Sequence, residues 1–236
     1  MVTLADVFEQ LSAGELAQLS LGGWEGKTVP EKDRSRVISH INMGLIALYT
    51  RFWISSKEVI IQIYDHIQTY ELDRKFAITN KLSVEPYRYI IDSVYQPFEN
   101  DVLKIEQVFN EGGELMFLND MTQPWSVFTP SYKTLQIPFP EKHNSMVVHY
   151  RAGHKKIVLA EHQDPAEVEI HLPLQLLEPL LFYVAHRAFA SLNSDQNQEG
   201  NNYFKKYENA CKAVELKGLL METSYGNHRL DQNGWI

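Results

Sequence analysis

The feature that most constrains the fold is the stretch from Leu172 to Thr223, which contains two helical patterns joined by a polar link. In the first pattern, apolar residues recur at steps of three and four, as on one face of an α-helix. They are Leu174, Leu177, Leu181, Val184, Ala188 and Leu192. Most of the remaining surface is apolar too, through Leu176, Leu180, Tyr183 and Phe189. A helix that is apolar on nearly all sides needs packing partners on several sides. Either the N-terminal helices or neighbouring subunits must supply them.

The second pattern has a narrower apolar stripe, which is typical of an amphipathic surface helix. The stripe consists of Phe204, Tyr207, Cys211, Val214 and Met221. The link 194–202, rich in Asn and Gln, breaks the periodicity and permits an αα-hairpin. Pro179 leaves two options for the first helix, because an interior proline removes a hydrogen bond. The helix either begins near Glu178 or kinks at Pro179.

The N-terminal region also predicts helices. Thr3 is an expected N-cap for a helix over Leu4–Leu11, since apolar residues recur there with helical spacing. Ser12, with Glu15 three residues later, predicts a second short helix through Leu21. A long helix is expected from Pro30 or Glu31 to about Phe52.

In the middle of the chain the period changes to two, which indicates β-strands. Glu58–Tyr70 alternates, and Val102–Phe109 and Glu114–Leu118 flank the turn sequence Asn110-Glu111-Gly112-Gly113, which predicts a hairpin. Tyr87–Val94 fits a strand or a helix. Further strand-like runs, several of them separated by prolines, are Trp125–Phe128, Thr134–Ile137, Met146–Tyr150, Lys156–Ala160 and Glu167–Leu172.

These patterns predict an α+β fold in which N- and C-terminal helices form a helical bundle with an inserted, mainly antiparallel β lobe. The expected helical domain comprises residues 1–56 and 173–225, and the β lobe residues 57–172. Residues 226–236 follow a helix-ending glycine and have no periodicity, so we expect an extended C-terminal arm.

Composition limits the classes of function that are open to this chain. The 236 residues are 44% hydrophobic and 22% charged, as in a globular protein, and the net charge of −8 argues against a surface that coats nucleic acid. The single cysteine, Cys211, excludes an internal disulfide and lies on an apolar stripe, which favours a buried packing role. Asp6 and Glu9 lie where a signal peptide would require an apolar run, so we do not expect secretion. The longest apolar stretches are too short to cross a bilayer, so no membrane partner is expected.

No cofactor or metal motif is present. The glycines around Trp24 lack the lysine and setting of a phosphate-binding loop, and no zinc-ligand spacing occurs. Glu167, Glu169 and His171 alternate and would share one strand face. A solvated strand face is a simpler interpretation of this pattern than a metal site. His149 and His154, on either side of an expected turn, are interpreted as surface residues.

Catalytic groups are equally hard to identify. Glu99 with Asp101, and Glu111 with Glu114, are the carboxylate pairs that glycosidase chemistry would need. Such pairs arise by chance among 30 acidic residues, and turns favour polar side chains. The aromatic residues are spread along the chain and suit core or interface positions. We therefore expect no enzyme and no catalytic residue.

Several stretches together resemble the head-to-tail adaptors of short-tailed bacteriophages, the family of tail tubular protein A. They are LADVFEQLSAGELAQL at 4–19, LKIEQVFNEGGELMFLND at 103–120, SVFTPSYKTLQIPFP at 126–140, HLPLQLLEPLLFYVAHRAFASLN at 171–193 and EGNNYFKKYENACKAVE at 199–215. They are spaced over most of the chain in the order helices, β lobe, helix pair and tail.

The resemblance implies a virion protein at the head–tail junction, made in the host cytoplasm. It implies a homo-oligomeric ring, a dodecamer, beneath the portal protein and above the tail tube or nozzle protein. DNA would leave the head through the centre of the ring without specific binding. The net negative charge suits such a channel, because DNA must slide without adhering.

The C-terminal arm is the expected docking segment. The simplest interpretation of this arm is a flexible terminus, yet the arm carries residues of the types that commonly anchor interfaces. The candidate portal- or subunit-binding residues are Tyr225, His228, Arg229, Leu230, Trp235 and Ile236. Two other functions compete with the adaptor: a virion-associated cell-wall hydrolase with a carboxylate pair, and a monomeric binding module.

Overall fold

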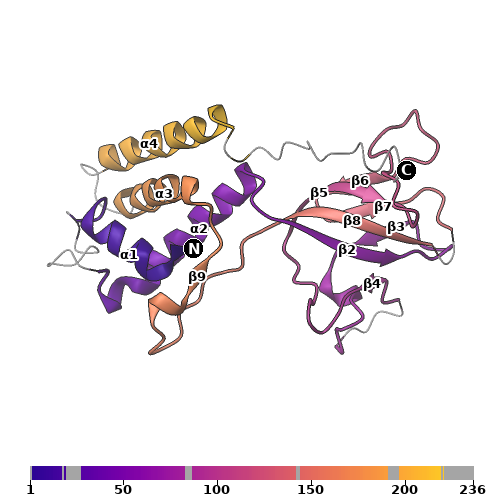
Figure 1. The fold of residues 1–236 in the computed structure, drawn as a ribbon, viewed down its shortest axis with the longest axis horizontal. Helices are drawn as coiled ribbons and strands as arrows, with labels where there is room; N and C mark the ends of the chain where they lie inside the picture. The colour runs from indigo at the N-terminus through magenta and orange to yellow at the C-terminus, as the bar shows by residue number, and fades with distance from the viewer. Residues whose placement is uncertain are drawn as a thin grey trace, which may run out of the picture. The chain divides into compact units, whose positions relative to one another are not determined.

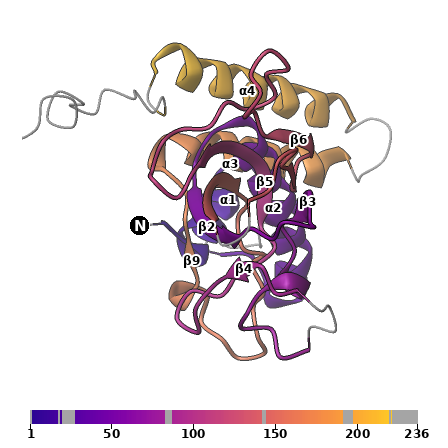
Figure 2. The same ribbon diagram turned by 90° about the vertical axis from the view of Figure 1, so that its right-hand side faces the viewer.

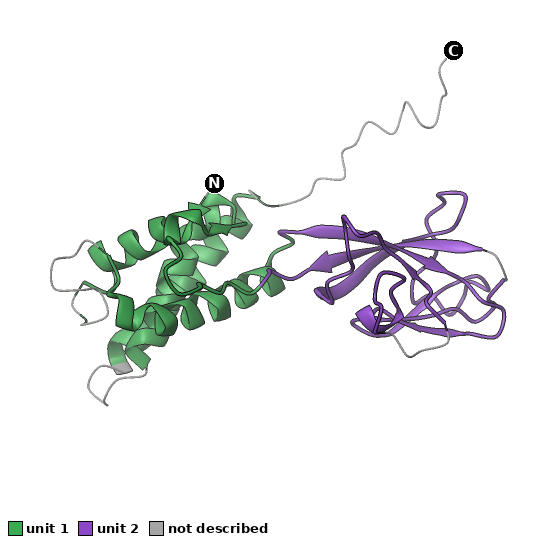
Figure 3. Cartoon of the chain, turned by 90° about the horizontal axis from the view of Figure 1, so that it is seen from below, with its two compact units in different colours: residues 1–53, 156–236 green, residues 54–155 purple. Residues whose placement is uncertain are grey.

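The computed structural model describes residues 2–17, 19, 28–82, 87–141, 144–190, 197–218 and 220. The chain has an α+β fold with helices at both ends and antiparallel sheets between them. It divides into two compact units (Figure 3). Unit 1 comprises residues 1–53 and 156–236, and unit 2 comprises residues 54–155.

Unit 1 contains the four α-helices of the described residues. They are α1 (Leu4–Ala13), α2 (Glu31–Arg51), α3 (Leu177–Ala190) and α4 (Asn197–Leu216). Helix α3 contacts all of the others and lies between α4 and the pair α1 and α2 (Figures 1 and 2). Its buried residues are Pro179, Leu180, Leu181, Val184, Ala185, Ala188 and Phe189. The chain's own helices therefore supply the cover that this apolar helix requires. Of the two sources of cover that the sequence leaves open, the structure shows the N-terminal helices α1 and α2, to which α4 is added.

The close packing of α3 depends on two glycines. A Cβ at Gly44 of α2 would lie 2.7 Å from Leu180 Cδ1, so the absence of a side chain there lets α2 and α3 approach each other. A Cβ at Gly200 of α4 would lie 3.2 Å from the backbone nitrogen of Ala190. Gly200 belongs to the segment predicted as a polar link, and α4 begins at Asn197, inside that segment. In the sequence Gly200 has the pattern of a helix breaker, whereas in the structure it lies within α4, where the packing against α3 leaves little room for a side chain.

The predicted N-cap is confirmed. The Thr3 side chain accepts a hydrogen bond from the Asp6 backbone N–H at 3.2 Å, and the Asp6 carboxylate accepts one from the Thr3 N–H at 2.8 Å. The predicted cap at Ser12 is wrong, because Ser12 is buried inside α1. The long helix to about Phe52 is confirmed as α2. Pro179 lies in the first turn of α3, where no N–H is needed.

Residues 156–172 belong to unit 1, although the sequence places them in the β lobe. Strand β1 (Val2–Thr3) pairs antiparallel with β9 (Glu169–Ile170). The amide of Asn42 donates to the carbonyl of Ile157 at 2.9 Å and accepts from its N–H at 2.8 Å. The predicted strand Lys156–Ala160 does not form. These contacts, between residues more than 100 positions apart in the sequence, bring the segment onto the helices.

Unit 2 consists of two antiparallel sheets around one core. The first has the order β4-β2-β8-β5, with β2 (Ser56–Gln62), β4 (Ile90–Ile91), β5 (Val102–Phe109) and β8 (Ser145–Ala152). The second has the order β3-β7-β6, with β3 (Thr69–Glu71), β6 (Phe128–Ser131) and β7 (Thr134–Gln136). The predicted strand Glu58–Tyr70 is two strands, β2 and β3, separated by a turn at Asp65 and His66.

Candidate interaction site

The most prominent surface feature of unit 2 begins at the turn after β5. The Asn110 side chain accepts a hydrogen bond from the Glu114 N–H at 2.8 Å, and the Asn110 carbonyl accepts one from the Gly113 N–H at 3.0 Å. Gly113 has φ +79°, a left-handed conformation that glycine adopts without a steric penalty. The predicted hairpin turn therefore forms. The returning segment makes two isolated bridges, Phe109 to Leu115 and Leu118 to Val127, and not the predicted strand Glu114–Leu118.

A buried serine joins this returning segment to the next one. Ser126 is 1% exposed; its hydroxyl donates to the Phe117 carbonyl and accepts from the Asp120 N–H, each at 3.0 Å. The Val127 N–H also donates to the Phe117 carbonyl, at 2.9 Å. The intervening turn is closed by Asp120, whose pKa is lowered by hydrogen bonds from the side chain and backbone of Thr122. The two segments thus form one hydrogen-bonded wall.

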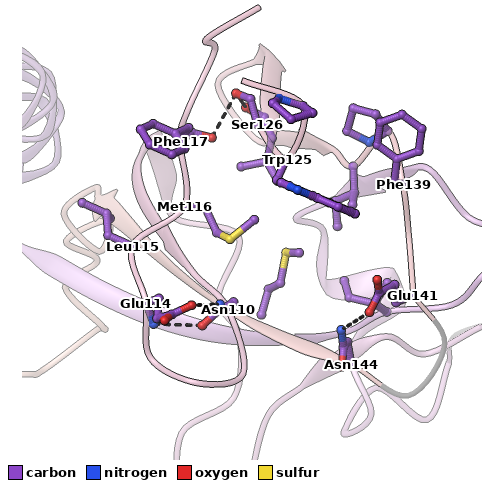
Figure 4. A pocket seen from close by; sticks show the side chains of 16 residues that line it. Asn110, Glu114, Leu115, Met116, Phe117, Trp125, Ser126, Phe139, Glu141 and Asn144 are labelled. Atoms are coloured by element: carbon purple, nitrogen blue, oxygen red, sulfur yellow. Dashed lines mark hydrogen bonds between the residues drawn. The ribbon is translucent and has the colours of Figure 1, made fainter. Parts of the chain in front are cut away.

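This wall encloses an apolar pocket of about 340 Å³ (Figure 4). Its lining includes four buried residues of the unit 2 core: Ile63, Val127, Ile137 and Met146. It also includes four large apolar side chains that remain more than half exposed: Leu115 at 59%, Phe117 at 55%, Trp125 at 62% and Phe139 at 63%. Trp125 and Phe139 meet edge to face, with ring centroids 6.1 Å apart. A cluster of exposed aromatic and aliphatic side chains around a cavity is typical of a binding surface.

The polar lining of the pocket has one sign of charge. Among the described lining residues, the charged side chains are both carboxylates, Glu114 and Glu141. Each accepts a hydrogen bond from a neighbouring amide, Glu114 from Asn110 at 2.9 Å and Glu141 from Asn144 at 3.2 Å. In the view of Figure 4 both pairs lie on the side opposite Trp125. The pocket therefore combines apolar walls with an acidic side.

The carboxylate pair Glu99 and Asp101 lies elsewhere on unit 2. The ammonium of Lys57 donates to Glu99 at 3.1 Å and to Asp101 at 2.6 Å, and the Tyr150 hydroxyl donates to Asp101 at 3.1 Å. The hydrogen bond from Lys57 lowers the pKa of Glu99. A general acid needs a raised pKa. The contact with Lys57 therefore shifts the pKa of Glu99 in the direction opposite to the one that a general acid requires.

The second pair, Glu111 and Glu114, lies in the turn after β5. The Glu114 carboxylate is held by Asn110, as described above. Throughout the described residues, every carboxyl group with a clearly shifted pKa has it lowered.

The proposed metal face does not form as the alternation suggests. Glu167 belongs to a short 3-10 helix (Pro165–Glu167), Glu169 is in β9, and the His171 carbonyl accepts a hydrogen bond from the Tyr49 hydroxyl. His149 does not border a turn but lies within β8, where its Nε2 is 3.3 Å from a Glu58 carboxylate oxygen. In the described part of the chain, no three His, Cys, Asp or Glu residues are placed to hold a metal ion.

Cys211 is buried in α4, and burial raises the pKa of its thiol. A raised pKa disfavours the thiolate, so the packing role expected from the apolar stripe fits this position. No helix among the described residues has the length and apolar character needed to cross a membrane.

The candidate arm residues Tyr225, His228, Arg229, Leu230, Trp235 and Ile236 lie outside the described residues. The pocket was missed by sequence reasoning, because its four exposed side chains come from separate segments. A weak signal exists in the sequence. Pro124 directly precedes Trp125, and Pro138 directly precedes Phe139, so both aromatic residues follow a rigid residue in a connection rather than in a strand core.

Comparison of the chain with models of known protein families gives no match, and neither does comparison with curated protein sequences.

Proposed function

We propose that this chain is a structural head-to-tail adaptor of a short-tailed bacteriophage. In this proposal it forms a homo-oligomeric ring, a dodecamer, at the head–tail junction of the virion. The ring joins the portal protein to the tail tube or nozzle protein and leaves a channel through which DNA passes without specific binding. The role is structural and requires no cofactor, metal or catalytic residue.

One observation carries the proposal. Two of the stretches that resemble the adaptor family, residues 103–120 and 126–140, supply most of the described lining of the apolar pocket. Its exposed side chains, Leu115, Phe117, Trp125 and Phe139, suit contact with another protein, because burial of large apolar groups stabilises an interface. The resemblance and the exposed surface therefore coincide at Leu115, Phe117 and Phe139, and Trp125 directly precedes the second stretch.

The finer architecture belongs to the same proposal. The four helices of unit 1 form a helical bundle, and the β unit is inserted between α2 and α3 in the chain order. Residues 226–236 form an extended arm that docks on the portal or on an adjacent subunit through Tyr225, His228, Arg229, Leu230, Trp235 and Ile236. The wall of the central channel is not strongly basic, in keeping with the net charge of −8.

Cryo-electron microscopy of the chain mixed with the portal rings of its phage tests this proposal. We expect a ring of added density beneath the portal, with a channel along its axis. A template ring is essential to the design, because some ring proteins remain monomeric without one. A portal ring that stays bare at saturating chain concentration would contradict the adaptor function, and a strongly basic channel wall would contradict the proposed passage of DNA.

Deletion of residues 226–236 tests the docking arm. The truncated chain should no longer comigrate with portal rings in size-exclusion chromatography. Circular dichroism should match that of the full chain, because the described helices end before this segment. A matched control replaces Asn227, Gln232 and Asn233 with Ser, which leaves the six anchor residues in place. Normal assembly of the truncated chain would refute the docking role.

The hydrolase is the weaker alternative. In its best pair, Glu99 and Asp101, both carboxylates accept a hydrogen bond from Lys57, which lowers the pKa of Glu99. Purified chain incubated with peptidoglycan should release no soluble fragments. Release that disappears in Glu99→Gln would favour the enzyme over the adaptor.

A further inference from the structure

The apolar pocket of unit 2 is preformed. Its wall is held by the Ser126 hydroxyl, which bonds to both Phe117 and Asp120, and by the Asn110 turn, so the cavity does not depend on an occupant for its shape. Of the four exposed side chains around it, Leu115, Phe117 and Trp125 lie on the segments that these bonds join, and Phe139 lies on the connection after β7. A preformed pocket costs little conformational entropy when it binds, which favours a specific protein contact.

The charge of the pocket restricts its occupant. The charged residues among its described lining, Glu114 and Glu141, are both acidic and both exposed. Their hydrogen bonds come from the neutral amides of Asn110 and Asn144 and not from cations. The complementary ligand is a segment in which a large apolar side chain lies next to a cation.

One segment of this chain has that chemistry. Residues 226–236 read GNHRLDQNGWI, in which Arg229 directly precedes Leu230, and Trp235 and Ile236 follow. The last described residue is Leu220, and sixteen extended residues span roughly 50 Å, enough to reach another molecule. The pocket and this segment are two different surfaces of one chain, as the head-to-tail contacts of a closed ring require.

We propose that the segment 226–236 of one copy docks in the apolar pocket of a second copy. Its apolar side chains contact Trp125 and Phe139, and the Arg229 guanidinium lies against Glu114 and Glu141. The inference rests on the proposed ring function for its choice of a second copy. It adds the pair of surfaces that join neighbouring subunits.

Binding of a synthetic peptide tests the contact directly. A fluorescein-labelled peptide of residues 224–236 is titrated into the full-length chain carrying Leu230→Ala and Trp235→Ala, in which the resident segment is weakened. We expect saturable binding, about tenfold weaker when Trp125 is replaced by Ala, as for a central aromatic anchor. A scrambled peptide should bind at least as weakly. Absence of saturable binding, or equal binding of the scrambled peptide, would overturn the proposal.

A charge exchange separates docking from folding defects. The peptide with Arg229→Glu should bind the same chain about fivefold more weakly at low salt, because an exposed ion pair contributes little. The double variant Glu114→Lys and Glu141→Lys should prefer the Arg229→Glu peptide over the native one. If the double variant misfolds, it will bind neither peptide. The role of Arg229 is then decided by comparing the native and Arg229→Glu peptides on the chain that keeps Glu114 and Glu141. Equal affinity for both peptides in both pockets would refute the role of these charges.

Sedimentation velocity decides whether the contact joins two copies. The full-length chain should self-associate with rising concentration. Arg229→Glu alone, and Glu114→Lys with Glu141→Lys alone, should each associate more weakly than the parent chain. Their mixture should associate more tightly than either variant alone, because each pocket then meets a segment of opposite charge. Peptide binding by a chain that remains monomeric at every concentration would overturn docking between copies. Portal binding without peptide binding contradicts this inference alone, whereas peptide binding without portal binding contradicts only the adaptor function.

Discussion

Ser126 offers the sharpest test of how the pocket wall is built. Its hydroxyl is buried and joins two segments, by donating to the Phe117 carbonyl and accepting from the Asp120 N–H. Ser126→Ala removes both bonds. The Phe117 carbonyl keeps a bond from the Val127 N–H, so one group, the Asp120 N–H, loses its partner. An unsatisfied buried donor costs about 1–3 kcal/mol, and because Asp120 is only partly buried we expect about 1–2 kcal/mol.

Hydrogen exchange measured by mass spectrometry resolves this change locally. A loss of about 1–2 kcal/mol corresponds to exchange roughly 5–30-fold faster in peptides covering residues 117–128. Peptides from α3 and α4 provide an internal reference, since they belong to unit 1.

The matched control is Ser93→Ala. The Ser93 hydroxyl also accepts a backbone hydrogen bond, from Gln96 at 3.1 Å, but Ser93 is exposed, so water replaces the bond. We expect less than about 0.5 kcal/mol there. Unchanged exchange at 117–128 in Ser126→Ala, or an equal effect in the control, would show that the serine does not hold the wall.

Three further predictions concern the packing of each unit. Arg51→Met should destabilise unit 1 by about 0.2–1 kcal/mol, because Arg51 bonds to Glu208 and Glu215 of α4 and these pairs are partly exposed. Arg51 lowers the pKa of Glu215, so the stabilisation is present above the ordinary pKa of 4.5 and is lost as pH falls below it. The difference in urea midpoint between variant and parent should therefore shrink in acid; a constant difference would refute the ion pair. Gly44→Val should lower the thermal midpoint of unit 1, since overpacking costs about 1–3 kcal/mol and valine offers little gain in helix propensity; an unchanged midpoint would mean that α2 and α3 separate freely. Asp92→Ala should speed hydrogen exchange at residues 79–80 and 97–99, because the Asp92 carboxylate accepts hydrogen bonds from Thr79 and Phe98. Equal protection of these amides in the variant and the parent would show that the carboxylate does not hold the two segments.

The covered helix α3 changes the basis of the ring proposal. The sequence leaves open whether the N-terminal helices or neighbouring subunits cover its all-round apolar surface, and in the structure α1, α2 and α4 supply the cover. An exposed apolar surface that borders a pocket is instead present on unit 2, around Trp125 and Phe139. Apolar periodicity reports that a surface is buried. It does not report which polypeptide buries it, because the transfer of an apolar side chain from water is non-directional.

Local chemistry in the sequence determined the elements that depend on neighbouring residues. The Thr3 cap and the Asn110–Gly113 turn each follow from side chains within four residues of the backbone they satisfy, and the helix from Glu31 follows from its apolar periodicity. Tertiary structure alone decided the rest. The transfer of 156–172 to unit 1 depends on the pairing of β1 with β9 and on Asn42, and the pocket brings Ile63 together with separate segments between residues 110 and 146. Such contacts form only after the whole chain has folded, because no local pattern specifies a partner at that separation.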